Sequence, residues 1–284
     1  MHFLLLAALL LHIPAQFDAE QAGATATGTR LLEETVQSAA LGRAMKYRVL
    51  LPSDYAISQR RYPVLYLLHG LGGDYKDWTT RTNVAEYSRT LPLIIVLPDG
   101  ENSWYTNAAN TPADRFEAYI LTDLPADVAG KYRTINSRHG RTIAGLSMGG
   151  YGALKMALKR PGAFAVAASF SGAFSATRHA EMVKLIRTED ERLRRIFGDD
   201  QSEVRRDNDV YALAAAARPG GAPYIYIDCG IADALLSSNQ EVVSAIHKSG
   251  LAYEYHEVAG GHTWEYWDKR IQEFLPLLMK KLSN

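Results

Sequence analysis

Apolar runs alternate with helical patterns along most of this chain of 284 residues. Val64–Leu68 and Leu93–Leu97 are continuous apolar runs, which are typical of strands buried on both faces of a parallel sheet. Further strand candidates are Thr29–Thr35, Ala44–Leu51, Thr142–Ala144, Ala165–Phe170, Tyr224–Ile227 and Ala252–Val258. Helical patterns lie between most of them, at Ala113–Tyr132, Gly149–Lys159, Ser237–Lys248 and Tyr266–Leu282. This alternation predicts an α/β protein with a mainly parallel, doubly wound sheet.

One connection between strands is longer than a crossover requires. It runs from Ala173 to Ala222 and has helical patterns near Ala180–Phe197 and Val210–Ala217. Ligands of open α/β sheets bind at the carboxyl edge of the strands, so we expect residues 173–222 to form a small helical lid insertion there. Packed peripheral helices away from any site are the alternative. Residues 27–284 are expected to form a single catalytic domain that includes this insertion.

The N-terminal segment differs in character from the rest. Phe3–Leu11 is an unbroken apolar run, which is shorter than the roughly 20 residues that cross a bilayer. The run fits the apolar region of a signal peptide, and the small residues of Ala22–Ala26 offer a cleavage site. We therefore expect residues 1–26 to be a signal peptide and flexible leader. The mature protein would be secreted or periplasmic, without a membrane attachment; the alternative is a disordered start with no targeting role.

Charge and metal-ligand patterns narrow the range of partners. The chain carries 31 Lys and Arg against 31 Asp and Glu, and short basic blocks such as Arg192–Arg195 fit a solvated helix face. A nucleic-acid partner is therefore not expected. The sequence has no H-E-x-x-H motif, no histidine pair at i, i+4 and no Cys–His cluster. No metal or other cofactor is expected, and the oligomeric state is left open.

A candidate nucleophile lies in the centre of the chain. Gly145–Gly149 has the pattern G-x-S-x-G. The apolar strand Thr142–Ala144 leads into it and the helical segment Tyr151–Lys159 leaves it, which is the strand, sharp turn and helix of a nucleophile elbow. The flanking glycines are expected because the turn leaves no room for a Cβ atom. The pattern predicts that Ser147 is a catalytic nucleophile.

A serine hydroxyl needs a base to accept its proton, and one histidine of the eight has a suitable position. His262 follows Gly260 and Gly261 directly after the last predicted strand. In serine hydrolases whose nucleophile lies in such an elbow, the base comes after the nucleophile and the acid in the sequence. His256 lies inside an alternating strand and is expected to be an ordinary sheet residue. We predict that His262 is the base.

The base in turn needs a carboxylate that orients the imidazole. Two aspartates near the strand Tyr224–Ile227 compete for this role. Asp228 ends the strand, and the pleat would dictate the direction of its side chain. Asp233 follows the Cys229–Gly230 turn, from which a loop residue can reach His262. We favour Asp233 and keep Asp228 as the alternative.

Negative charge that develops on a substrate oxygen requires positioned N–H donors. The residue after the nucleophile, Met148, supplies one of them. The second is expected from the glycine-rich segment His69–Gly73, with Leu71 N–H as the donor. A plain glycine-rich turn is the alternative. A phosphate-binding loop is not favoured, because no Lys-Ser or Lys-Thr follows the glycines.

Five motifs together identify a known family. They are Tyr62–Gly73, Ser103–Tyr105, Arg141–Gly152, Cys229–Asp233 and His262–Trp264. With these motifs, the chain from about Ala44 to Leu282 resembles the esterase D and tributyrin esterase group of α/β hydrolases. That group includes S-formylglutathione hydrolases, feruloyl esterases and acetyl xylan esterases. The resemblance implies an α/β-hydrolase fold, and it also places the acid on Asp233 and the oxyanion donors on Leu71 and Met148.

The expected function is that of a serine carboxylesterase. An acyl-enzyme on Ser147 would form and be hydrolysed during turnover of short-chain acyl, acetyl or feruloyl esters of small molecules or carbohydrates. Trp104, Tyr105 and Trp264 are expected to wall the substrate pocket, with core packing as the alternative for each. Other candidate functions are an acyltransferase with the same triad, an S-formylglutathione-type thioesterase, a peptidase and a binding protein without catalysis.

Overall fold

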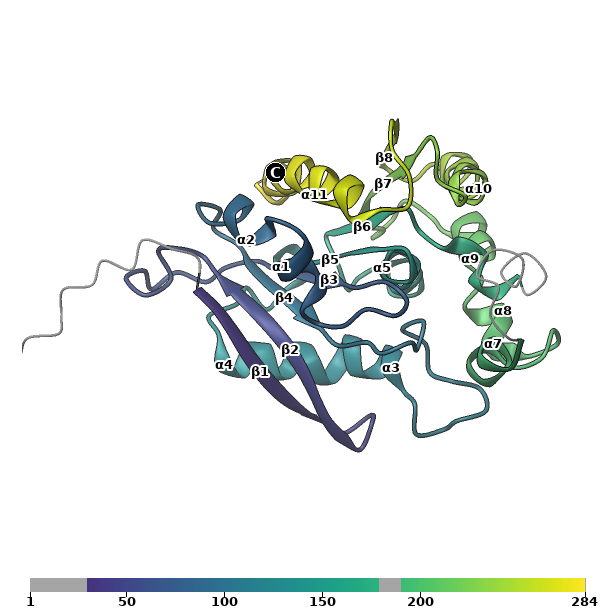
Figure 1. The fold of residues 1–284 in the computed structure, drawn as a ribbon, viewed down its shortest axis with the longest axis horizontal. Coiled ribbons are helices and arrows are strands. Elements are labelled where there is room, and N and C mark those ends of the chain that lie inside the picture. Colours follow the sequence, from purple (N-terminus) through teal and green to yellow (C-terminus); the bar gives the residue numbers. More distant parts are fainter. Residues whose placement is uncertain (1–29, 179–189, 284) are drawn as a thin grey trace, which may run out of the picture.

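The computed structural model describes residues 30–178 and 190–283, and an eight-stranded sheet lies at their centre (Figure 1). The strands are β1 (Arg30–Ser38), β2 (Arg43–Leu51), β3 (Val64–Leu68), β4 (Ile94–Pro98), β5 (Arg141–Leu146), β6 (Val166–Phe170), β7 (Tyr224–Gly230) and β8 (Tyr253–Val258). Their order in the sheet is β1-β2-β4-β3-β5-β6-β7-β8. β2 pairs antiparallel with both β1 and β4, and all other pairs are parallel. The mainly parallel, doubly wound sheet predicted from the sequence is confirmed.

The helices described by the structure lie on both faces of the sheet (Figure 1). They are α1 (Asp77–Arg81), α2 (Val84–Tyr87), α3 (Phe116–Ala118), α4 (Leu124–Lys131), α5 (Met148–Lys159), α7 (Asp190–Phe197), α8 (Glu203–Asp207), α9 (Val210–Ala216), α10 (Leu236–Lys248) and α11 (Trp264–Leu282). A π-helical turn, η1 (Tyr119–Asp123), joins α3 to α4, and the short 3₁₀ turns are η2 (Arg138–Gly140) and η3 (Phe174–Thr177). The first expected helix therefore begins at Phe116 instead of Ala113 and is irregular.

The alternation of side chains along each strand divides the core between the two faces. In β3, Tyr66 and Leu68 belong to the cluster that includes α4, α5, α9 and α10. Leu65 and Leu67 belong to the cluster that includes α1, α2 and α11. All four are 3% exposed or less, and burial of each such side chain contributes on the order of 2 kcal/mol. This double burial explains why the strand was visible as an apolar run.

Two short helices after β3 were not predicted from the pattern of apolar residues. α1 and α2 have five and four residues, which is too short for a 3.6-residue period to show and too short for stability in isolation. They are held by tertiary contacts: Trp78 in α1 is 1% exposed, and its indole N–H donates to the Leu68 carbonyl oxygen at 3.0 Å.

The expected lid is described only in part. Part of its first predicted helix lies outside the described residues, and α7 covers the remainder. α7 and α9 contribute Leu193, Phe197 and Val210 to the same core as α5 and α10. In Figure 1 these helices lie beside α5. The described helices of the insertion therefore flank the carboxyl edge of the sheet on the α5 side.

The leader predicted at residues 1–26 lies outside the described residues. Within residues 30–178 and 190–283, no helix is long and apolar enough to span a membrane.

Candidate active site

Ser147 lies in a strained turn between β5 and α5. Its backbone has φ 52° and ψ −116°, a conformation that side chains other than glycine rarely adopt. A Cβ atom at Gly145 would lie 2.5 Å from the Gly149 backbone, and one at Gly149 would lie 2.5 Å from the Leu68 carbonyl oxygen. The two glycines are therefore required for β5, β3 and α5 to meet closely enough to form the turn. Strain of this kind is frequent at active sites.

The structure brings Ser147, His262 and Asp233 together in one hydrogen-bonded chain. His262 Nε2 lies 3.0 Å from Ser147 Oγ, and His262 Nδ1 lies 2.9 Å from Asp233 Oδ2. The three residues follow the carboxyl ends of β5, β8 and β7, which meet at one edge of the parallel sheet. With a proton on Nδ1 donated to Asp233, Nε2 is free to accept the serine proton, as nucleophilic catalysis requires.

The surroundings of Asp233 keep its carboxylate charged. Its side chain is 0% exposed, and burial alone would raise its pKa. The hydrogen bonds from His262 and from the Leu235 N–H outweigh burial and hold the pKa of Asp233 below its usual value. The carboxylate is thus able to orient the imidazole and to stabilise it when it becomes charged.

Asp228, the alternative acid, accepts its hydrogen bonds from α11, and His262 bonds to Asp233 instead. Asp228 lies within β7, which extends to Gly230, beyond the end expected from the sequence. Its oxygens accept hydrogen bonds from the Tyr266 hydroxyl at 3.0 Å and from Arg270 Nε at 3.3 Å. Burial raises the pKa of Asp228 to about 6 although these partners oppose the shift. Asp228 therefore joins α11 to the sheet.

Two backbone N–H groups lie next to the nucleophile. Leu71 is in the loop that follows β3, and Met148 is the first residue of α5. Neither N–H donates a hydrogen bond within the described part of the chain. Leu71 lines the same pocket as Ser147, and the Met148 N–H belongs to the N-terminal turn of α5, where the helix dipole favours negative charge. Leu71 and Met148 therefore stay the predicted oxyanion donors.

His69 fixes the direction of the Leu71 N–H. Its Nε2 accepts the Gly100 N–H at 2.9 Å, so the ring proton is on Nδ1, which donates to the Gly70 carbonyl oxygen at 2.8 Å. The Gly73 N–H donates to the same oxygen at 3.2 Å. The Gly70 carbonyl and the Leu71 N–H belong to the same peptide unit. Because this unit is planar and trans, the two groups point in opposite directions. Holding the Gly70 carbonyl in this way leaves the Leu71 N–H available on the other side.

The pocket over Ser147 has a volume of about 230 Å³. Its lining residues are Gly70, Leu71, Gly72, Gly73, Asp77, Arg81, Leu146, Ser147, His262, Trp264 and Trp267. Of the three aromatic residues expected in its wall, the structure places Trp264 there. No described residue of the 173–222 insertion lines it.

Trp104 and Tyr105 were expected in the pocket wall, and this expectation is wrong. Their side chains are 1% and 0% exposed. Both residues have positive φ, 54° and 49°, in a turn that directs the two rings into the core. The Trp104 ring packs against Tyr151, and the Tyr105 hydroxyl donates to the His69 carbonyl oxygen at 3.0 Å. Tyr105 therefore supports from the core the glycine-rich segment His69–Gly73, here called the oxyanion loop.

Three side chains that line the pocket, those of Asp77, Arg81 and Trp267, were not expected from the sequence. Trp267 stands edge-on to the His262 ring, with centroids 4.8 Å apart at 88°; its spacing of three from Trp264 at the start of a helix was an available signal. Asp77 and Arg81 come from α1 and form an ion pair at 3.4 Å. Their i, i+4 spacing was the corresponding signal for that helix. Within the described residues, no group of three or more His, Cys, Asp or Glu residues could hold a metal ion.

Comparison with known proteins agrees with this geometry. The model of the Esterase family matches residues 38–278. An acetyl esterase of Caldicellulosiruptor saccharolyticus is 31% identical over 220 residues, covering 76% of this chain and 82% of the relative. An esterase of Mycobacterium tuberculosis is 33% identical over 258 residues, covering 83% of this chain and 56% of that longer protein.

A solved structure shows the same fold. The fluorophosphonate-binding serine hydrolase F of Staphylococcus aureus is 26% identical and superposes with a TM-score of 0.78, covering 89% of this chain and 99% of the other. The resemblance found from the sequence motifs is thus confirmed at the level of family and fold. The chain belongs to the Esterase family of α/β-hydrolase enzymes, the serine hydrolases of carboxylic esters.

Proposed function

We propose that this protein hydrolyses short-chain carboxylic esters by two-step acyl transfer through Ser147, with His262 and Asp233 completing the triad. The observation that carries the proposal is the hydrogen-bonded chain from Ser147 Oγ through His262 to Asp233, with distances of 3.0 and 2.9 Å. Ser147 and His262 line a pocket that Leu71 also lines. The finer placement in the esterase D group is part of the same proposal.

In the first step, Ser147 Oγ attacks the ester carbonyl carbon while His262 Nε2 accepts the hydroxyl proton. The N–H groups of Leu71 and Met148 stabilise the charge on the carbonyl oxygen. The tetrahedral intermediate collapses, His262 gives its proton to the departing alcohol, and an acyl-enzyme is left on Ser147. In the second step His262 takes a proton from water, which attacks the acyl carbon. The bond to Ser147 Oγ then breaks, His262 gives the proton to that oxygen, and the acid is released.

The size of the pocket supports a small substrate. Its volume of about 230 Å³ is below the roughly 300–1,000 Å³ of sites that enclose drug-sized ligands. The relative from Caldicellulosiruptor saccharolyticus is named an acetyl esterase, and we extend that acyl class to this chain. Trp264 and Trp267 offer ring faces or edges to an aryl or sugar group of the substrate.

A substrate panel tests the proposal. The purified protein is assayed with p-nitrophenyl acetate, butyrate and octanoate, methyl ferulate, acetylated xylan and S-formylglutathione. We expect kcat/KM to be highest for acetate or butyrate and to fall at octanoate. An added alcohol distinguishes hydrolysis from acyl transfer, because it competes with water for the acyl-enzyme. A transferase would give mostly the new ester, and a hydrolase would give mostly the free acid. Absence of turnover on every ester by a folded protein would refute the proposal.

We also propose that the protein is exported, on the basis of the apolar run Phe3–Leu11 and the small residues of Ala22–Ala26. The full chain is expressed in a secreting bacterial host, and the N-terminus of the product is determined by mass spectrometry. A mature chain that begins near Ala26 outside the cytoplasm is expected. An uncleaved cytoplasmic product would contradict the proposal.

A further inference from the structure

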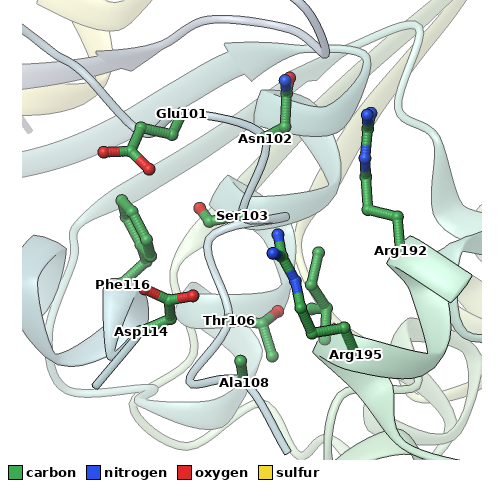
Figure 2. Close-up of a pocket in the computed structure, with 10 residues that line it drawn as sticks. Glu101, Asn102, Ser103, Thr106, Ala108, Asp114, Phe116, Arg192 and Arg195 are labelled. Atoms are coloured by element: carbon green, nitrogen blue, oxygen red, sulfur yellow. The ribbon is translucent and has the colours of Figure 1, made fainter. Parts of the chain in front are cut away.

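A second pocket lies beside the oxyanion loop, between the segment after β4 and helix α7 (Figure 2). Its volume is about 210 Å³. The residues that line it are Glu101, Asn102, Ser103, Thr106, Ala108, Asp114, Phe116, Arg192, Arg195 and Ile196. We call it the arginine pocket. It is strongly polar, with charged side chains on two opposite walls.

The acidic and the basic side chains of the arginine pocket differ in their ion pairs. Its acidic residues share a partner, because Arg43 lies 2.9 Å from the Glu101 carboxylate and 3.6 Å from that of Asp114. Arg192 and Arg195 form no ion pair within 4.0 Å in residues 30–178 and 190–283. Figure 2 shows the Arg195 guanidinium pointing from α7 towards Ser103, and Arg192 on the same wall. Two cationic groups are thus available to a ligand.

The wall that carries the arginines is held in place by backbone contacts. The Ala109 N–H donates to the Ile196 carbonyl oxygen at 2.8 Å, and the Asn110 N–H donates to the Arg195 carbonyl oxygen at 3.0 Å. Phe197 packs its ring against Trp104, with centroids 6.3 Å apart. Since the helix end is fixed on both sides, binding a ligand does not require ordering of its backbone.

The opposite wall is fixed from the core. Lys155 is fully buried, and its Nζ lies 3.0 Å from Thr106 Oγ1 and 3.0 Å from Glu117 Oε2. These contacts hold the segment after β4, which carries Ser103 and Thr106. Both walls of the arginine pocket therefore belong to well-packed structure.

The arginine pocket adjoins the pocket of Ser147. Gly72 lines the Ser147 pocket, and its N–H donates to the Asn102 Oδ1 atom at 2.7 Å. Asn102 lines the arginine pocket. Gly72 also directly follows Leu71, the expected oxyanion donor. One hydrogen-bonded contact therefore separates residues that line the two pockets.

We propose that the arginine pocket binds a carboxylate group carried by the ester substrate, so that the enzyme prefers anionic esters to neutral ones of the same length. Guanidinium groups bind carboxylates through paired, charge-assisted hydrogen bonds, and both Arg192 and Arg195 line this pocket. This inference rests on the proposed esterase function. It adds a specificity site that the triad itself does not provide.

Matched pairs of esters test the inference and locate the carboxylate relative to the scissile bond. Monomethyl adipate against methyl heptanoate places the charge on the acyl side, and 4-acetoxybutyrate against pentyl acetate places it on the alcohol side. Acid release is followed at low ionic strength. We expect the anionic ester of at least one pair to have the higher kcat/KM, and high salt to reduce this preference because it screens the charges.

Variants assign the preference to the arginines. Arg195→Gln and Arg192→Gln should lower kcat/KM for the preferred anionic ester, by about tenfold or more for Arg195→Gln, and leave the neutral esters unchanged. Arg160→Gln is the control, since this exposed residue directly follows α5, roughly 20 Å from Ser147. Turnover of neutral esters with no anionic preference in either pair would overturn the inference, as would a preference that both arginine variants retain. Loss of all ester turnover by the wild type would instead refute the proposed function.

Discussion

The hydroxyl of Tyr266 donates a hydrogen bond to the buried carboxylate of Asp228, with 3.0 Å between the two oxygens. Tyr266 also packs on Gly260, where a Cβ atom would lie 2.4 Å from its ring. Because Tyr266 lies in the first turn of α11, these contacts join the helix, the loop that carries His262 and strand β7. A buried contact outside the triad thus helps to join the loop that carries the base to the sheet.

Asp228→Asn should reduce stability and leave the chemistry largely intact. The variant removes the charge that faces Arg270, and the expected cost is about 1–3 kcal/mol of unfolding free energy. Thermal unfolding followed by circular dichroism should show a lower midpoint, while kcat of the folded enzyme changes little. A catalytic defect as large as that of a triad variant, at unchanged stability, would contradict this role.

Asp233→Asn should show the opposite behaviour. Asparagine keeps the shape but not the charge that holds a proton on His262 Nδ1, a change that costs on the order of 10⁴ in kcat in a serine protease triad. The comparison uses one short-chain ester, with Asp228→Asn as the matched control. Near-normal turnover by Asp233→Asn would show that another group orients His262.

Glu117 predicts a pH dependence of stability. Burial alone would raise its pKa, but Lys155 and Lys159, at 3.0 and 2.9 Å, lower the pKa to about 2 from 4.5. A lowered carboxylate pKa stabilises the fold at pH values above 4.5, and this contribution is lost as the pH falls from 4.5 towards 2. The shift corresponds to about 3 kcal/mol.

The test is urea unfolding of Glu117→Gln and wild type between pH 7 and pH 3. We expect the variant to be about 3 kcal/mol less stable at pH 7, and the difference to shrink below pH 4.5. Glu265→Gln is the control, because Glu265 is 82% exposed in its pair with Lys269, and exposed pairs contribute little. A difference that stays constant over the whole range would contradict the assignment.

The sequence predicted best what depends on short-range pattern. Val64–Leu68 was found as a strand with the same bounds, because residues buried on both faces leave an unbroken apolar run. The elbow at Ser147 was visible because close packing requires glycine at Gly145 and Gly149. Chain order along the parallel sheet then led to Asp233 and His262, which the structure brings into contact.

The features that the sequence did not reveal depend on tertiary structure. Trp104 and Tyr105 were predicted to line the pocket. Their turn has positive φ angles that direct both rings into the core, and the sequence pattern did not show this turn. From the sequence, the basic block Arg192–Arg195 was interpreted as a solvated helix face. The contact of α7 with residues 109 and 110, which places two arginines beside the oxyanion loop, involves residues more than 80 positions apart in the chain.

The central claim is that Ser147 is the nucleophile, and covalent labelling tests it most directly. An alkyl p-nitrophenyl phosphonate transfers its phosphonyl group to an activated serine oxygen and releases p-nitrophenolate. We expect one p-nitrophenolate per chain, loss of esterase activity in the same proportion, and a phosphonyl group located on Ser147 by peptide mass spectrometry, with no labelling of Ser147→Ala. Stoichiometric inactivation with the label on any other residue, or full esterase activity in Ser147→Ala, would contradict the account.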